Sequence, residues 1–203
     1  MAHVLHIRKW GGVIKLHHKF LSQVQGSPII AAVKDQKKIE QAIHSPCNII
    51  FLLSGSIFNL KEIVDRCKEQ DKCILVHLDL MEGLSKDAVA LKYLHNNIKP
   101  DGVITTKSNL IKIAKDMGMF SIQRLFILDS LSLDSGIKSI RSTKPDAIEI
   151  LPGIMPKIIQ TIHHETRIPL IAGGLIRDKE DVINVLNAGA VGVSTSKREI
   201  WYA

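Results

Sequence analysis

Residues 169–196 read PLIAGGLIRDKEDVINVLNAGAVGVSTS, and this stretch decides the fold. A short apolar run ends in two glycines, an amphipathic helical pattern follows, and a second apolar run ends in the triplet STS. This order is typical of two consecutive strand-to-helix units in a parallel sheet. When such a pair closes a longer series of units, it corresponds to the seventh and eighth units of a (β/α)8 barrel.

The ends of these two runs form a candidate phosphate site. Gly173 and Gly174 let a ligand approach bare backbone amides, and Ser194 and Thr195 add hydroxyl donors beside the start of a helix, which favours anions. The alternative is that both are ordinary turns whose hydroxyls cap helices.

The rest of the chain alternates in the same way. Short β-rich runs are separated by stretches with helical periodicity, and strict alternation favours a closed barrel over an open doubly wound sheet, the alternative architecture. We therefore predict the α/β class and a single (β/α)8 TIM barrel over residues 28–203. The expected strands are 29–33, 48–53, 73–78, 102–105, 122–128, 147–150, 170–172 and 190–193, and the expected helices include 57–69, 86–96, 108–117, 155–164 and 178–188.

Composition narrows the class of protein. A chain of 203 residues with 45% hydrophobic residues fits one domain. Three cysteines without a CxxC pair indicate neither a disulfide framework nor a zinc site. No apolar stretch is long enough to span a membrane, and we find no secretory signal. We expect a cytoplasmic protein without a membrane partner.

The charge is basic, +7 with a pI of about 9.3, which makes nucleic acid a plausible partner but also serves solubility. Residues 1–27 contain no acidic residue and form a basic arm, which we expect to be partly helical and to cap the bottom of the barrel.

Polar residues at the predicted strand ends are candidate ligand groups, since barrels bind ligands at this face. Lys107 could pair with a phosphate, form a Schiff base or lie in solvent. Glu149 lies in an apolar run and needs a partner or a polyol, and Arg124 could pair with it across the barrel interior. Asp79 could equally be a helix cap. No catalytic triad, P-loop or metal motif is found, so we assign no catalytic residue, metal or cofactor.

Several strings together resemble one family: PIIAAVKD (28–35), VHLDLMEGLSKD (76–87), DGVITTK (101–107), IQRLFILDSLSL (122–133), PDAIEILPGIMPKII (145–159) and GVSTS (192–196). They are similar to the bacterial glycerol uptake operon antiterminator regulatory proteins. The resemblance implies a barrel that binds glycerol-3-phosphate as an effector and then binds the leader of a glycerol catabolic messenger, so that a terminator does not form. It places the phosphate at Gly173, Gly174, Ser194 and Thr195, and the glycerol moiety near Asp79, Glu82, Lys107 and Glu149.

Two classes of function remain open: an RNA-binding regulator, or an aldolase or isomerase acting on a small phosphorylated substrate. An enzyme acting on a small substrate does not need cationic surface away from the ligand end of the barrel, so an excess of lysine and arginine there favours the regulator. The alternative explanation for such an excess is a basic face that contacts only solvent. The candidate RNA-binding residues lie on two helices expected to be neighbours, with Arg8 and Lys9 of the arm as a secondary possibility: Lys112, Lys115, Lys138, Arg141 and Lys144. A homo-oligomer is possible.

Overall fold

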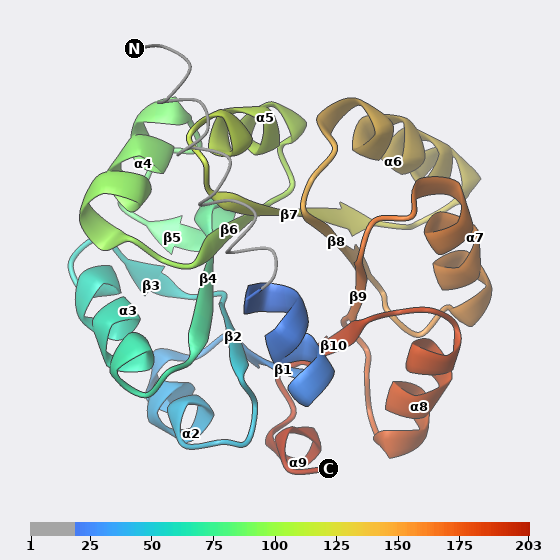
Figure 1. Cartoon of the computed structure of the whole chain (residues 1–203), viewed down its shortest axis with the longest axis horizontal. Helices are drawn as coiled ribbons and strands as arrows, with labels where there is room; N and C mark the ends of the chain where they lie inside the picture. The colour runs from blue at the N-terminus through green and yellow to red at the C-terminus, as the bar shows by residue number, and fades with distance from the viewer. Residues whose placement is uncertain (1–18) are drawn as a thin grey trace.

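The computed structural model describes residues 19–203 and contains a closed barrel of eight parallel strands, surrounded by helices (Figure 1). This confirms the predicted (β/α)8 TIM barrel. Each barrel strand pairs with its neighbours in chain order, and the last strand pairs with the first. The barrel strands are β1 (Ile29–Val33), β2 (Ile49–Leu52), β4 (Cys73–His77), β6 (Gly102–Thr105), β7 (Phe120–Phe126), β8 (Ala147–Leu151), β9 (Leu170–Gly173) and β10 (Gly192–Thr195).

Helices cover the outside of the barrel, and three of them begin at an aspartate whose side chain satisfies amide groups of the first turn. Asp87, Asp129 and Asp178 each accept hydrogen bonds from the first turn of a helix, which is the role of an N-cap. The helices are α2 (Ile39–Ile43), α3 (Leu60–Glu69), α4 (Ala88–Tyr93), α5 (Ser108–Asp116), α6 (Ser130–Thr143), α7 (Pro156–Thr166), α8 (Lys179–Asn187) and α9 (Arg198–Trp201).

Two barrel strands are shifted by two residues from their predicted positions. β7 begins at Phe120, and β10 begins at Gly192 and continues to Thr195. In both cases the apolar run does not mark the paired segment, because apolar residues also fill the turns that flank a buried strand. A small parallel sheet outside the barrel, β3 (Gly55–Ser56) with β5 (Met81–Glu82), was not predicted.

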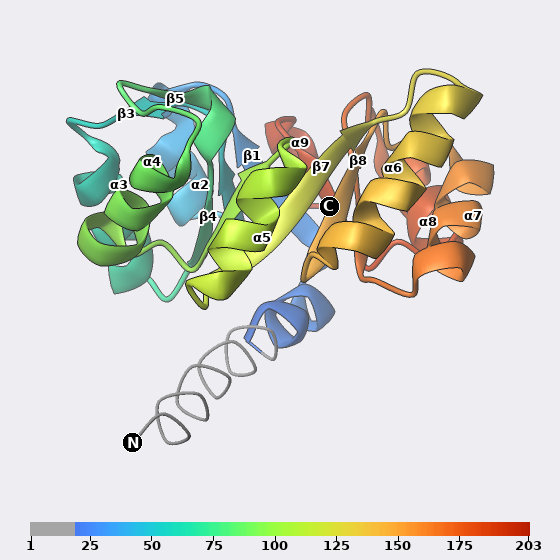
Figure 2. The same cartoon turned by 90° about the horizontal axis from the view of Figure 1, so that it is seen from above.

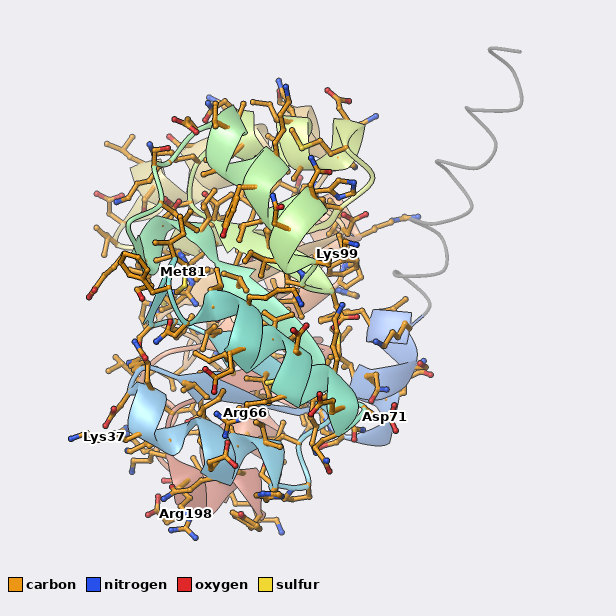
Figure 3. The ribbon with its side chains drawn as sticks, turned by 90° about the vertical axis from the view of Figure 1, so that its left-hand side faces the viewer. Lys37, Arg66, Asp71, Met81, Lys99 and Arg198 are labelled. Carbon is orange, nitrogen blue, oxygen red and sulfur yellow. The ribbon has the colours of Figure 1, made fainter. Side chains whose placement is uncertain are left out.

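A helix over residues 19–26 covers one end of the barrel. In Figure 2 it lies below the strands, and Figure 3 places Asp71 and Lys99 at this end and Met81 at the opposite end. Phe20 and Val24 of this helix are buried and pack into the barrel interior, where the rings of Phe20 and Phe120 lie 4.8 Å apart. This helix therefore closes the bottom of the barrel and leaves the carboxyl ends of the strands as the open mouth.

Residues 1–18, including Arg8 and Lys9 of the predicted basic arm, lie outside the described residues. Over residues 19–203 no helix has the length and apolar character needed to cross a membrane.

Replacing Phe20 with alanine should destabilise the fold by about 3 kcal/mol, because it leaves a cavity at the closed end of the barrel. The control is Gln25→Ala, which changes an exposed position of the same helix. Urea denaturation followed by circular dichroism measures both variants. Equal stability of the two would show that this helix does not close the interior.

Candidate functional site

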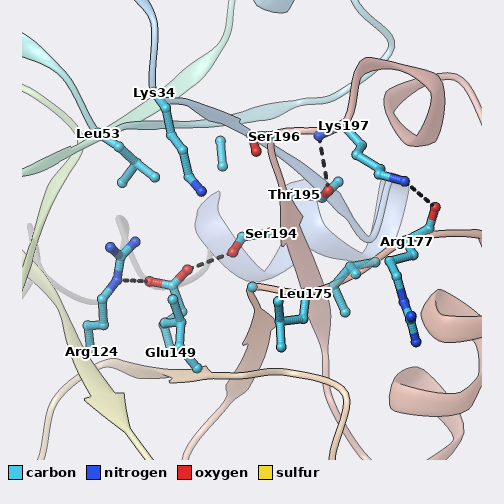
Figure 4. A pocket seen from close by; sticks show the side chains of 14 residues that line it. Lys34, Leu53, Arg124, Glu149, Leu175, Arg177, Ser194, Thr195, Ser196 and Lys197 are labelled. Carbon is cyan, nitrogen blue, oxygen red and sulfur yellow. Dashed lines mark hydrogen bonds and ion pairs between the residues drawn. The ribbon is translucent and has the colours of Figure 1, made fainter.

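A cavity of about 300 Å³ opens at the mouth of the barrel (Figure 4). Its walls come from the first two strands, from β7 and β8, and from the loops that follow β9 and β10. The residues that line it are Ala32, Lys34, Leu53, Arg124, Glu149, Leu151, Gly174, Leu175, Ile176, Arg177, Ser194, Thr195, Ser196 and Lys197.

A buried ion pair forms the floor of the cavity. Arg124 and Glu149 are register partners on β7 and β8, and Arg124 Nε donates to Glu149 Oε2 at 2.7 Å. Ser194 on β10 donates its hydroxyl to Glu149 Oε1 at 2.6 Å. The side chains of Arg124 and Glu149 are only 6% and 1% exposed, so this hydrogen bonding is what compensates the cost of removing the two charges from water. The predicted pairing is confirmed, although it joins neighbouring strands.

Gly173 makes room for this arrangement. A Cβ atom at this position would lie 2.6 Å from Ser194 Oγ and 2.8 Å from Glu149 Oε1, closer than atoms can approach. Any other residue here would displace the carboxylate or the hydroxyl. The glycine is therefore needed for the contact between Glu149 and Ser194.

The cavity carries an excess of positive charge. Arg124 uses Nε for Glu149, and its terminal nitrogens point into the cavity, as does the ammonium group of Lys34 (Figure 4). Lys34 forms no ion pair within residues 19–203, and Lys197 donates to the carbonyl oxygen of Arg177 at 3.0 Å. With Glu149 already paired to Arg124, the remaining cations are suited to bind an anion.

The predicted phosphate residues lie together at this cavity, but the hydroxyl of Ser194 is already engaged by another side chain. Gly174, Ser194 and Thr195 line it, and Gly173 lies beside its floor. The hydroxyl of Ser194 is donated to Glu149, so it positions the carboxylate. The Thr195 hydroxyl accepts a hydrogen bond from the backbone amide of Lys197 at 3.2 Å, and this bond shapes the loop after β10.

Three predicted glycerol-side residues lie on another part of the rim and do not line the cavity. Asp79 accepts hydrogen bonds from the hydroxyls of Thr105 and Thr106 and from the Thr106 amide, at 2.7–2.8 Å. Burial raises the pKa of Asp79, but these hydrogen bonds outweigh burial and hold the pKa below its ordinary value. Glu82 is exposed on β5, and Lys107 Nζ donates to the carbonyl oxygen of Lys86 at 3.3 Å.

Lys34 was not among the predicted site residues. It directly follows the apolar run of β1, and a charge at this place in a barrel strand was the available signal. Its neighbour Asp35 caps the short helix over Gln36–Lys38 by accepting a hydrogen bond from the Lys37 amide.

Two of the five predicted cations, Lys112 and Lys138, line a groove of about 510 Å³ between α5 and α6, whereas Arg141 and Lys144 line another pocket beside α7. Among the described residues, no acidic side chain lines the groove, and the lining residues are Ser108, Asn109, Lys112, Ser135, Lys138, Ser139, Ser142 and Thr143. Lys115 Nζ donates to the carbonyl oxygen of Lys144, which joins the two helices as expected. Arg141 differs from the other cations because it faces α7 and pairs with Glu165.

His77 is a buried polar residue of the barrel interior. It follows Leu75, an interior residue, by two positions on β4, so strand alternation directs it inward. It is 2% exposed, and among residues 19–203 its Nδ1 is the one buried side-chain nitrogen or oxygen without a hydrogen-bond partner. Burial and the nearby Arg124 guanidinium lower the pKa of His77 to about 3.

Acidification from about pH 7 to about pH 5 should therefore destabilise the fold by about 2 kcal/mol through His77. Below its ordinary pKa the unfolded chain binds a proton at this imidazole, whereas the folded chain does not until its pKa of about 3 is approached. Urea denaturation at both pH values measures the decrease in the free energy of unfolding. This decrease should be smaller in His77→Leu than in the parent protein, and it should be unchanged in His164→Gln, which alters an exposed position. Equal losses in His77→Leu and the parent would contradict this assignment.

Comparison with known proteins places this barrel among regulators. A family model described as glycerol-3-phosphate responsive antiterminator matches residues 29–201. An uncharacterised Escherichia coli K12 protein, YgcP, is 42% identical over 181 residues, which are 89% of this chain and 95% of that protein. The crystal structure of the glycerol uptake operon antiterminator regulatory protein from Listeria monocytogenes is 38% identical with a TM-score of 0.84, over 86% of this chain and 95% of that one. A glycerol uptake operon antiterminator-related protein from Thermotoga maritima is 32% identical with a TM-score of 0.77, over 85% and 96%. The chain belongs to the glycerol-3-phosphate responsive antiterminator family.

Proposed function

We propose that this protein binds glycerol-3-phosphate in the cavity at the barrel mouth and, in the liganded state, binds the leader of a glycerol operon messenger and prevents formation of a terminator. The observation that carries the proposal is the coincidence of family membership with a small cavity whose cations exceed its acids. A volume of about 300 Å³ suits a small metabolite and is too small for a folded RNA element.

The phosphate group would lie between Lys34 and the loops that follow β9 and β10. A phosphate monoester carries close to two negative charges at neutral pH, and Lys34, Lys197 and the amides beside Gly174 supply positive charge around that position. The phosphate position agrees with the usual anion site of this fold, after the seventh and eighth barrel strands. The glycerol hydroxyls would then face Glu149 and the terminal nitrogens of Arg124.

We propose a sensor and not an enzyme. Among the cavity-lining residues of the described chain, Glu149 has the one carboxylate, and its two oxygens already accept from Arg124 and Ser194. A general base needs a carboxylate free to take a proton, and acid–base catalysis needs a second group beside it. Lys107, the candidate Schiff-base lysine, lies outside the cavity. Turnover of glycerol-3-phosphate or a triose phosphate by the purified protein would overturn this reading.

The RNA would bind the outer wall at the α5–α6 groove. Lys112 and Lys138 line the groove, Lys115 lies on α5, and Lys144 directly follows α6 as its C-cap. None of these four lysines forms an ion pair with a residue of the described chain, so their charges are available to RNA phosphates. Arg141 contributes less, because Glu165 offsets its charge. Three buried free thiols, Cys47, Cys67 and Cys73, fit the reducing cytoplasm in which a messenger is bound.

Replacing Lys34 with methionine should weaken glycerol-3-phosphate binding by about tenfold, because a charge-assisted contact to the phosphate is lost. Isothermal titration calorimetry measures this, with Lys107→Met as the matched control on another strand end. Glycerol alone should bind far more weakly than glycerol-3-phosphate to the parent protein. If Lys107→Met weakens binding and Lys34→Met does not, the ligand occupies the part of the rim near Asp79 and Lys107.

Replacing both Lys112 and Lys138 with glutamine should weaken leader RNA binding and reduce the slope of log affinity against log salt by about 1.5, because each phosphate contact releases less than one counterion. The control is the double variant Lys92→Gln, Lys179→Gln, which removes the same charge from exposed positions on α4 and α8. Filter binding across a salt series measures both. An unchanged slope in the first variant would show that the groove is a solvated basic face.

A further inference from the structure

We propose that β7 couples the ligand cavity to the α5–α6 groove, with Gln123 as the positioning residue that fixes α6 to the back of this strand. The inference rests on the proposed function, since it describes how the occupied cavity changes the RNA-binding surface. It is carried by two neighbouring residues, Gln123 and Arg124, that face opposite sides of one strand.

Arg124 connects β7 to the cavity. Its side chain faces the barrel interior, where Nε binds Glu149 and the terminal nitrogens face the space that the ligand would fill (Figure 4). Because Arg124 is almost completely buried and is tied to β8, it has little freedom to move without its own strand. A ligand whose hydroxyl group contacts these terminal nitrogens therefore acts directly on β7.

Gln123 connects the same strand to α6. It is 1% exposed on the outer face of β7, where its Nε2 donates to Ser139 Oγ at 2.7 Å and its Oε1 accepts from Thr143 Oγ1 at 2.7 Å. Ser139 and Thr143 both line the groove between α5 and α6. One side chain thus reaches from the strand that carries Arg124 to the residues that form the groove.

Gln123 differs from its register partners on the neighbouring strands in bonding to a helix. Its partner on β8, Ile148, is apolar and packs without directional bonds. Its partner on β6, Thr105, is polar but donates its hydroxyl to Asp79 at the rim and not to a helix. A buried amide needs both of its partners, because an unmade hydrogen bond in the interior costs about 1–3 kcal/mol. Gln123 therefore holds α6 in one position relative to β7, where an apolar residue would let it slide.

Packing beside Gln123 makes this position tight. Gly136 of α6 lies against Leu125 of β7, so closely that a Cβ atom at Gly136 would be 3.2 Å from Leu125 Cδ1. Because α6 packs closely on β7 at Gly136, a small movement of β7 at Arg124 would shift α6 with it. The groove between Lys112 and Lys138 changes width when α6 moves relative to α5.

The first test follows α6 without RNA. Hydrogen exchange measured by mass spectrometry should show that saturating glycerol-3-phosphate changes exchange across residues 130–143, and that Gln123→Met abolishes this change while the Kd for glycerol-3-phosphate stays within about twofold. The matched control, Ser121→Ala, removes a buried hydrogen bond to Asp146 on the same face of the same strand and should retain the change. Thr143→Val, which keeps its shape and loses one bond to Gln123, should reduce the change and serves if Gln123→Met does not fold.

The second test measures the coupling itself. The ratio of the Kd for a transcript of the glycerol operon leader, without and with glycerol-3-phosphate, should be about 5–150 for the parent protein and should fall toward 1 for Gln123→Met. A parent-like ratio, or a parent-like exchange response, in Gln123→Met overturns the coupling role and leaves the proposed function intact. If the parent binds no leader RNA while its exchange response is present and is lost in Gln123→Met, the RNA part of the proposed function fails and the coupling stands.

Discussion

The buried ion pair between Arg124 and Glu149 is the constraint on which the barrel mouth depends. Removing two charges from water costs several kcal/mol for each ion. Removing one of the two side chains by substitution would leave the charge of the other buried without a partner. The fold meets this cost with a third strand, through the Ser194 hydroxyl, and with the missing side chain at Gly173. Three barrel strands, β7, β8 and β10, are thereby joined by polar side-chain contacts, and Gly173 on β9 leaves the space that these contacts need. The same arrangement leaves the terminal nitrogens of Arg124 facing the cavity, so the interaction that organises the mouth also supplies hydrogen-bond donors to the cavity.

The closed barrel could be predicted from the sequence because its evidence is periodic and repeated. Eight apolar runs alternate with helical stretches, so an error of two residues in β7 or β10 does not change the architecture. The floor of the site could also be anticipated, since Glu149 and Arg124 each interrupt an apolar strand and a buried charge requires a partner. The glycines and hydroxyls at the ends of β9 and β10 could be grouped from the sequence, and in the structure they lie together at one cavity.

The remaining site residues could not be assigned from the sequence, because every strand in a barrel ends near the mouth and the sequence does not show which ends face the same cavity. Asp79 and Lys107 follow strands as Lys34 does, yet Asp79 is engaged by Thr105 and Thr106 and Lys107 bends toward Lys86. Arg141 illustrates the same limit on the outer wall. Its own helix contains no nearby acid that would pair with it, and Glu165 comes from the next helix in the chain.

A barrel strand has two faces, and this property allows a metabolite site to influence an outer surface. Interior side chains of β7 contribute to the cavity, while its outer side chains pack against α6, and the two sets alternate along one backbone. In most strands of this barrel the outer set is apolar and only adds to the core between sheet and helices. β7 differs because Gln123 replaces an apolar contact with two directional hydrogen bonds beside Arg124. The bottom of the barrel, filled by Phe20 and Phe120, holds the lower part of the same strand in place. Under the proposed coupling, movement of β7 would be confined to its mouth end, where the cavity and the groove residues of α6 lie on either side of it.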